Sequence, residues 1–194
     1  MRLRKLIINH RIAENSRILA RLVHDVSERD YLNHASTLPL SRSQFVTLKI
    51  LLYTGPFTIG DIASTIGISR AAASKNIDKL VKMKLVQRKE VPTDRRSTRV
   101  SILAAGEIIV ESYDARRNEK QQKILSSFTD REKTLFNNLL EKYIRGALQH
   151  EGNFDLMCLM CGGEYDEACV IKDTRGLCYY KDIANVDETN GKSI

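Results

Sequence analysis

Four cysteines near the C-terminus are the residues of this 194-residue sequence whose spacing best suits chemistry. They follow the pattern C-x2-C-x7-C-x8-C and are Cys158, Cys161, Cys169 and Cys178. The first two form a tight knuckle, because two intervening residues let both sulfurs face one ion. The N-terminal residues do not read as a signal peptide, so we expect a reducing compartment, where clustered cysteines favour a metal over disulfides.

Four thiolates at this range can hold a tetrahedral zinc ion or an iron–sulfur cluster. The knuckle favours Zn²⁺, although a zinc ribbon normally supplies a second C-x2-C pair. Apolar residues around the first two cysteines suit a poorly solvated iron–sulfur cluster instead. We narrowly favour zinc, with the cluster as the alternative. Redox-active thiols come next, and structural disulfides last.

A second group of candidate residues lies in the basic stretch from Ile66 to Arg96. Thr58 and Ser69 have the sequence pattern of N-caps for two short helices joined across Gly67, which predicts a helix-turn-helix. The second helix should run to about Met83. Its inward face is predicted to contain Ala73, Ile77, Leu80 and Val81, and its outward face Arg70, Ser74, Lys75, Lys79 and Lys82. An exposed basic face on the second helix suits the major groove of DNA.

A β-hairpin is predicted directly after this helix. Residues 86–91 and 99–103 read as short strands rich in β-branched residues, joined through residues 92–97. The predicted connection carries Arg95 and Arg96 at its tip. Arginines on a narrow hairpin can enter a minor groove, where the negative potential is enhanced.

Amphipathic helices are predicted on both sides of this unit. The long first helix covers residues 3–33, and its exposed apolar positions favour packing against another subunit. Capping patterns at Ser41 and Thr129 begin two further helices, the second reaching Leu148. A helix over residues 104–127 carries a polar middle, residues 114–122, that we expect to face solvent.

Charge and composition limit the kind of partner. The net charge is +7, but the residues from Glu151 onward carry 4 basic and 9 acidic side chains, so residues 1–150 carry +12. A basic body suggests a polyanionic partner, although a solvated lysine-rich surface would look similar. With 42% hydrophobic residues and no run of eighteen apolar residues, we expect a soluble, cytoplasmic protein without a membrane segment.

The order of these elements resembles the MarR family of winged helix-turn-helix transcription regulators over roughly residues 10–150. The most specific part is the segment from Lys84 to Gly106, in which Asp94-Arg95-Arg96 resembles the D-x-R wing signature of the family. The resemblance implies a homodimer on double-stranded DNA, with recognition helices in successive major grooves and wings on the flanking minor grooves. It also implies a small-molecule effector as a possible signal.

The predicted DNA-binding residues combine the helix and wing positions: Ser69, Arg70, Ala71, Ala72, Ser74, Lys75, Lys79, Asp94, Arg95 and Arg96. Three departures from the family pattern have structural consequences. Lys84 stands where a helix-ending glycine is common, so a left-handed backbone there would cost about 1 kcal/mol. Leu103 replaces the usual Thr cap of the next helix, and the alanines at positions 71–73 replace a Ser/Thr-rich segment.

The sequence therefore predicts a mainly α fold with a small β-hairpin: a winged helix-turn-helix flanked by N- and C-terminal dimerisation helices. Residues 1–150 would form this DNA-binding and dimerisation domain, and residues 151–194 a cysteine-rich, metal-binding extension. The expected function is a homodimeric, sequence-specific transcriptional regulator that responds to metal, redox state or a small molecule. The alternative is a metal- or thiol-dependent enzyme or carrier. No nucleophile elbow, phosphate loop, HExxH motif or paired catalytic carboxylates support that alternative, so we expect no enzymatic activity.

Overall fold

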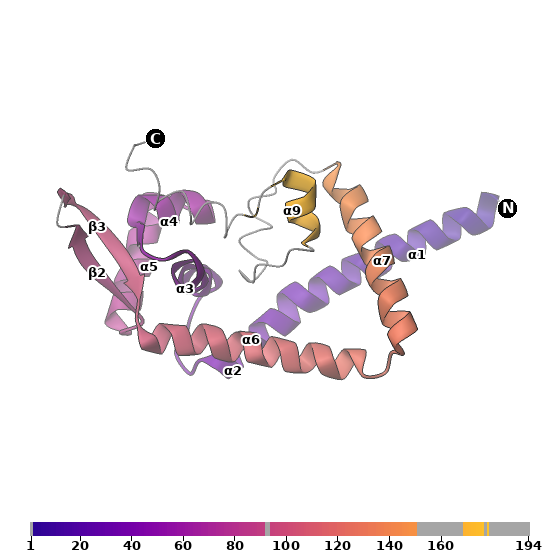
Figure 1. Ribbon diagram of the computed structural model, residues 1–194, viewed down its shortest axis with the longest axis horizontal. Helices are drawn as coiled ribbons and strands as arrows, with labels where there is room; N and C mark the ends of the chain where they lie inside the picture. The colour runs from indigo at the N-terminus through magenta and orange to yellow at the C-terminus, as the bar shows by residue number, and fades with distance from the viewer. Residues whose placement is uncertain (1, 92–93, 151–168, 177, 179–194) are drawn as a thin grey trace.

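The computed structural model describes residues 2–91, 94–150, 169–176 and 178. These residues form helices and one small sheet, as the sequence predicts (Figure 1). In chain order the elements are α1 (Arg2–Arg21), the π-helix η1 (Leu22–Ser27), α2 (Glu28–Ala35), α3 (Arg42–Thr54), β1 (Phe57–Thr58), α4 (Ile59–Ile66), α5 (Arg70–Lys82), β2 (Val86–Val91), β3 (Asp94–Ile102), α6 (Ala104–Leu125), α7 (Asp130–Leu148) and α9 (Val170–Arg175).

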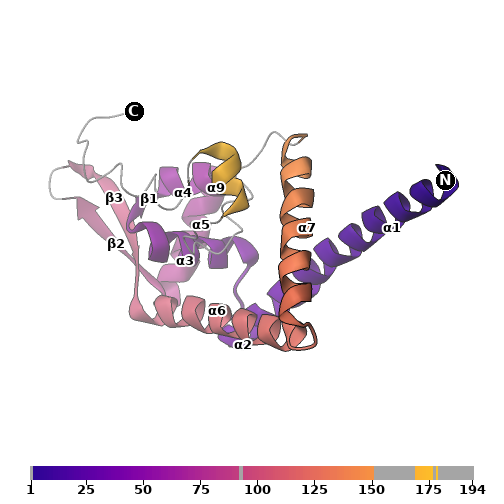
Figure 2. The same cartoon turned by 45° about the vertical axis from the view of Figure 1, so that its right-hand side comes forward.

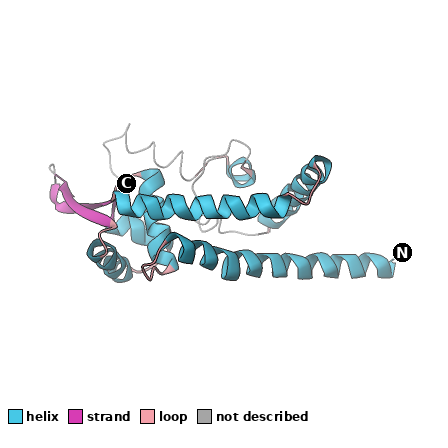
Figure 3. Cartoon of the chain, turned by 90° about the horizontal axis from the view of Figure 1, so that it is seen from below, coloured by secondary structure: helices cyan, strands magenta, loops and turns pink. Residues whose placement is uncertain are grey.

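The first three helices form one continuous rod, which confirms the predicted long N-terminal helix. The π-helix in its middle was not predicted, because apolar periodicity does not separate a π-turn from an α-turn. The rod extends away from the rest of the molecule, with the N-terminus at its far end (Figure 3). Its apolar side chains are exposed and include Ile7, Ile8, Ile12, Ile18, Leu19, Leu22, Val23 and Val26.

Side-chain caps fix where the helices of the central unit begin. Ser41 and Thr58 are each the N-cap of a complete capping box, closed by Gln44 and Asp61 respectively. The Oγ of Ser69 accepts the N–H of Ala72 at 3.2 Å and so begins α5. Gly67 between α4 and α5 has φ +70°, a conformation that glycine adopts without steric cost. All of these helix starts were predicted from the sequence.

The sheet has three antiparallel strands in the order β1-β3-β2. The two-residue strand β1 was not predicted; Phe57 pairs with Val100 at the edge of the hairpin. The predicted second strand was also too short, since β3 begins at Asp94 rather than at Arg99. Val91 pairs with Asp94, and residues 94–97 belong to the strand. The predicted six-residue tip is therefore wrong, because strand pairing beyond a charged, poorly β-forming segment cannot be read from its composition.

The core lies between α3, α4, α5, α6 and the sheet. Its largest fully buried side chains are Leu48, Ile50, Leu51, Ile62, Ile77, Leu80, Leu85, Val86, Val100 and Val110. Gly106, on the first turn of α6, lies tightly against this core. A Cβ at that position would come within 2.6 Å of the Leu85 carbonyl oxygen, so no larger residue fits without a backbone shift.

The polar middle of α6 faces solvent on one side only, which confirms the expectation for residues 114–122 in part: the exposed residues are Ala115, Asn118, Glu119, Gln121 and Gln122. Asp114 is buried, and Arg116, Arg117 and Lys120 are half-buried. The nearby helix α2 explains part of this burial: Asp30 on α2 forms ion pairs with Lys120 and Arg116. Polar residues on a helix can face another helix when they find partners there, and a polar run alone does not reveal this.

The last two helices lie beyond α6. A capping box between Thr129 and Glu132 begins α7, as predicted. The short helix α9 lies in the space between α7 and the unit that contains α3 and α4 (Figures 1 and 2). Within the described part of the chain, no helix is long and apolar enough to cross a membrane.

Candidate nucleic-acid interface

Helix α5 presents a basic face to solvent and an apolar face to the core. Ala73, Ile77 and Leu80 are buried, as predicted. Val81 was predicted to lie with them, but it is 37% exposed because its position is turned toward the edge of the buried face. The exposed basic side chains on this helix are Arg70, Lys75, Lys79 and Lys82. The helix therefore packs against the core with its apolar side and exposes four basic side chains on the other side.

The predicted helix residues lie together at the start of α5. Ser69 is the exposed N-cap, and Arg70, Ala71 and Lys75 are exposed in the first two turns. Ala72 and Ser74 are half-buried, and Lys79 is exposed one turn further along. The Asn76 amide donates to the Ser43 hydroxyl of α3 at 3.1 Å, which ties the middle of α5 to the core helix. The predicted residues thus lie on the exposed surface of α5, and the hydrogen bond to α3 helps to fix the position of this helix.

The hairpin rises beside α5 (Figure 1). The residues of the predicted wing signature, Asp94, Arg95 and Arg96, lie at the start of β3, next to the turn. At the base of the hairpin, Arg88 of β2 pairs with Asp78 of α5, with the guanidinium nitrogen 2.8 Å from the carboxylate. This ion pair braces the hairpin against the helix.

The connection between α5 and β2 has the geometry anticipated from the sequence. Lys84 has φ +57°, the one non-glycine residue with positive φ in the described chain. Its N–H donates to the Val81 carbonyl at 2.9 Å, and the next N–H, of Leu85, donates to Leu80 at 3.0 Å. These hydrogen bonds satisfy carbonyl groups in the last turn of α5. The left-handed backbone of Lys84 is strained, but it allows these hydrogen bonds to form. Leu103, likewise as expected, begins α6 without a side-chain cap.

Two of the four cysteines belong to the described residues. Cys158 and Cys161 lie outside them. Cys169 is the N-cap of α9, and Cys178 follows the same helix; both side chains are half-buried. Among the described residues no three His, Cys, Asp or Glu side chains converge as metal ligands would. The four-cysteine site therefore stays a prediction.

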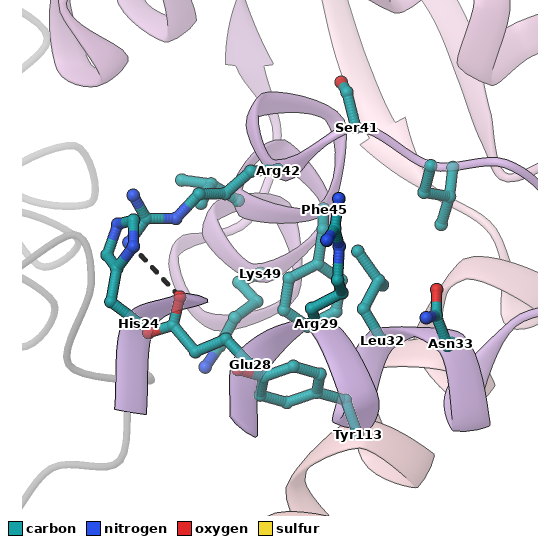
Figure 4. Close-up of a pocket in the computed structure, with 12 residues that line it drawn as sticks. His24, Glu28, Arg29, Leu32, Asn33, Ser41, Arg42, Phe45, Lys49 and Tyr113 are labelled. Carbon is teal, nitrogen blue, oxygen red and sulfur yellow. Dashed lines mark ion pairs between the residues drawn. The ribbon is translucent and has the colours of Figure 1, made fainter. Parts of the chain in front are cut away.

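A cavity of about 450 Å³ lies on the other side of α3, between that helix and the N-terminal rod. Its wall combines aromatic and charged side chains from η1, α2, α3 and α6 (Figure 4): His24, Glu28, Arg29, Leu32, Asn33, Leu40, Ser41, Arg42, Phe45, Val46, Lys49 and Tyr113. The Arg42 guanidinium lies 3.3 Å from the Glu28 carboxylate across one side. Burial, and then the charge of Glu28, raises the pKa of Tyr113, which therefore stays a neutral phenol.

Behind this cavity lies a buried charge network that the sequence reasoning missed. The Lys49 ammonium is 3.6 Å from Asp114 Oδ1, and the Arg117 guanidinium is 3.3 Å from the same oxygen. The Tyr53 hydroxyl donates to Asp114 Oδ2 at 2.7 Å. A signal for this network exists in the sequence, since Lys49 is the one charged residue in the mostly apolar run FVTLKILL, residues 45–52. A buried lysine in such a run needs a charged partner.

A capped helix pair with an exposed basic second helix, followed by a hairpin braced against it, defines a winged helix-turn-helix protein. The MarR family model matches residues 40–98, the segment that holds α3, α4, α5 and the start of the hairpin. The uncharacterized HTH-type transcriptional regulator YsmB of Bacillus subtilis is 34% identical over 123 residues, which span 63% of this chain and 79% of YsmB. The chain belongs to the MarR family. It is a DNA-binding transcriptional regulator, as predicted, and not an enzyme.

Solved structures agree with this assignment at the level of the fold. A MarR family protein from Bacillus stearothermophilus is 25% identical, with a TM-score of 0.57, and 72% of this chain covers 97% of it. A MepR variant from S. aureus bound to an oligodeoxyribonucleotide is 20% identical, with a TM-score of 0.55 and coverage of 68% and 97%. Each of these two matches leaves more than a quarter of this chain uncovered.

Proposed function

We propose that this regulator is a homodimer that reads duplex DNA with the start of α5 in the major groove and the β2–β3 hairpin on the adjacent minor groove. The observation that carries the proposal is the two-sided character of α5. Its apolar side is anchored in the core, while Arg70 and Lys75 are exposed toward the N-terminal end, where a recognition helix meets base edges, and Lys79 is exposed further along.

Each part of the surface suits a different component of DNA. Arg70 or Lys75 can donate to guanine O6 and N7, and the small Ala71 permits close approach to a thymine methyl group. Arg95 and Arg96, next to the hairpin turn, suit the negative potential of a narrow minor groove. The MepR variant of similar fold is bound to an oligodeoxyribonucleotide, which supports DNA as the partner. A role on chromosomal DNA would place the protein in the cytoplasm.

The dimer would form through helices that lie outside the DNA-reading unit, which consists of α3, α4, α5 and the β2–β3 hairpin. Large apolar side chains are exposed on the N-terminal rod and also on α7, where they include Leu135, Phe136, Leu139 and Tyr143. Exposed apolar faces of this extent are typical of a subunit interface. A second copy of the chain is the partner that would place two recognition helices on one DNA duplex.

The DNA-reading assignment is tested with duplexes that the wild-type protein selects from a random pool. We expect Arg70→Ala and Lys75→Ala each to weaken binding, Arg70→Ala by about 10-fold or more if it reads a guanine. Lys142→Ala, which removes an exposed charge from α7, is the matched control and should leave affinity unchanged. If the α5 variants bind as tightly as the control variant, α5 is not the reading helix.

The hairpin is tested with the same duplexes. Arg95→Ala combined with Arg96→Ala should weaken binding and reduce its dependence on salt concentration, since two contacts with the polyanion are removed. Unchanged affinity at moderate salt would contradict the wing assignment without affecting the assignment of α5.

Two places can receive the signal that controls binding. The cavity beside Lys49, with Arg29 and Arg42 at its wall and aromatic rings within it, suits a small organic anion. The second is the cysteine extension, residues 151–194, for which we propose a metal centre formed by Cys158, Cys161, Cys169 and Cys178. Zinc is favoured over an iron–sulfur cluster because of the C-x2-C knuckle.

Metal analysis and the absorption spectrum of protein purified without oxygen test the cysteine proposal. Near one zinc per chain and no visible absorption would support a zinc site. A brown protein that contains iron and sulfide would replace zinc with a cluster. If neither metal is present at near one site per chain, the metal centre is wrong and thiol chemistry becomes the leading explanation.

A further inference from the structure

Helix α9 joins two parts of the molecule that do not otherwise share a long contact. On one side it packs against α7, where the Arg145 guanidinium lies 2.9 Å from the Asp173 carboxylate. On the other side, Ile171 and the nearby Cys178 pack against the buried residues Val46 and Ile50 of α3. The two contacts are of different kinds, one an exposed ion pair and the other an apolar contact.

The face of α3 that α9 covers is connected directly to the functional parts. Val46 lines the cavity beside Lys49 as well as contacting the α9 segment. One turn along α3, Ile50 is fully buried, and its neighbours Leu48 and Leu51 belong to the core cluster that also holds Ile77 of the recognition helix. A helix fastened at this face therefore fixes the position of the DNA-reading unit relative to α7.

We propose that α9 is an intramolecular strap that holds α7 against α3, and that its release lowers the affinity of the regulator for DNA. In a dimer built through α7, the angle between α7 and α3 sets the separation of the two recognition helices. A docked strap restricts that angle before binding. When the strap is released, the two recognition helices sample more separations. Only a fraction of the dimers then has the separation that fits DNA, and the apparent affinity falls by that fraction.

The strap also gives the cysteines a way to act on DNA binding. The side chain of Cys178 is part of the apolar contact with α3, and Cys169 is the residue from which α9 begins. A Cys178 sulfur that joins three other cysteines around one ion would be held by that ion in place of the apolar contact with Val46 and Ile50. Metal binding at the proposed cysteine site would thus favour the released strap; this step rests on the proposed metal centre, whereas the strap itself does not.

The docking contact is tested in the full-length protein with Ile171→Asp, which places a charge in the apolar contact, and Arg145→Ala, which removes the ion pair. Arg131→Ala, on an exposed arginine of the same helix α7, is the matched control. Release is measured as the rate of alkylation of Cys178, resolved by peptide mass spectrometry. Circular dichroism of each variant establishes that the fold is retained.

We expect both strap variants to speed alkylation of Cys178 several-fold and to weaken binding to the selected DNA duplex about three- to ten-fold, with the control variant unchanged. Faster alkylation with unchanged or tighter DNA binding would overturn the strap. Alkylation at the wild-type rate in Ile171→Asp would overturn it as well, because the contact would then not depend on the docked helix.

A zinc titration separates the strap from the metal proposal. Zinc should weaken DNA binding by the wild-type protein and have little further effect on Ile171→Asp, in which the strap is already released. If the protein binds no zinc, the zinc site fails while the comparison of variants stands. If zinc binds and weakens both proteins equally, the cysteine site acts on DNA binding by a route other than α9, and the link between the cysteines and the strap is overturned.

Discussion

Lys84, between α5 and β2, has a backbone conformation that favours glycine. Its φ of +57° costs roughly 1–2 kcal/mol for a side chain with a Cβ. Lys84→Gly should therefore stabilise the protein by about 0.5–1 kcal/mol, because part of the gain is lost to the greater freedom of glycine in the unfolded chain. The measurement is the free energy of unfolding from a denaturant titration.

Lys84→Ala is the matched control for this prediction. Alanine removes the long side chain but keeps the Cβ, so it should leave the stability nearly unchanged. Equal stabilisation by alanine and glycine would show that the lysine charge, and not the backbone conformation, is the source of the cost.

The buried network around Asp114 shows that a single residue in the sequence does not identify its partner in the fold. Lys49 was visible as a charge in an apolar run, but its partner lies 65 positions along the chain, in a segment whose composition suggests solvent exposure. Local patterns predict that a buried charge needs a partner; they do not identify which one. The cavity beside this network was missed for the same reason, since its wall comes from four separate helical segments.

At the scale of the element, helix starts were the most predictable feature of the fold. Ser41, Thr58, Ser69 and Thr129 each accept a backbone N–H, as their sequence patterns predict. Capping is local, so a few neighbouring residues contain the whole signal. The short strand β1 depends on pairing with β3, which is far away in the sequence, and the early start of β3 depends on pairing with the end of β2. Neither pairing is visible in the local composition, and both were missed.

The capping box of α7 makes stability depend on pH. Hydrogen bonds to the Glu132 carboxylate from the backbone N–H and then the hydroxyl of Thr129, both 2.8 Å long, lower the pKa of Glu132 in the folded protein. Folding thus favours the ionised carboxylate. The resulting stabilisation is present above the ordinary value of 4.5 and is lost as the pH falls through the lower folded pKa.

Glu132→Gln tests this dependence, since glutamine can accept the same hydrogen bonds but does not titrate. The wild-type protein should be the more stable of the two at pH 6, and its advantage should shrink between pH 5 and pH 3. Thermal unfolding at a series of pH values measures the difference. An advantage that is constant over this range would contradict the proposed role of the carboxylate.

At the scale of the whole molecule, the sequence and the structure contribute different information about assembly. Apolar periodicity predicted the long N-terminal helix and exposed apolar positions on it, and the structure shows that apolar side chains of the rod and of α7 lack cover within the described chain. The periodicity could not predict that α9 would lie between α7 and α3. These are relations between elements, and they follow from packing that no local pattern specifies.

The dimer proposal is tested by placing charge on the exposed apolar face of α7. Leu135 and Leu139 lie one turn apart and are 58% and 57% exposed, so replacing both with Glu should leave the fold of a single chain intact. We expect the wild-type protein to sediment as a dimer at micromolar concentration and the Leu135→Glu, Leu139→Glu variant as a monomer. DNA binding by the variant should weaken by roughly 10-fold or more, because the second recognition helix is no longer held beside the first.

Asn138→Glu, which adds charge at an exposed polar position of the same helix, is the control and should remain dimeric. A wild-type protein that sediments as a monomer, or a double variant that remains a dimer, would show that α7 is not the helix through which two copies associate.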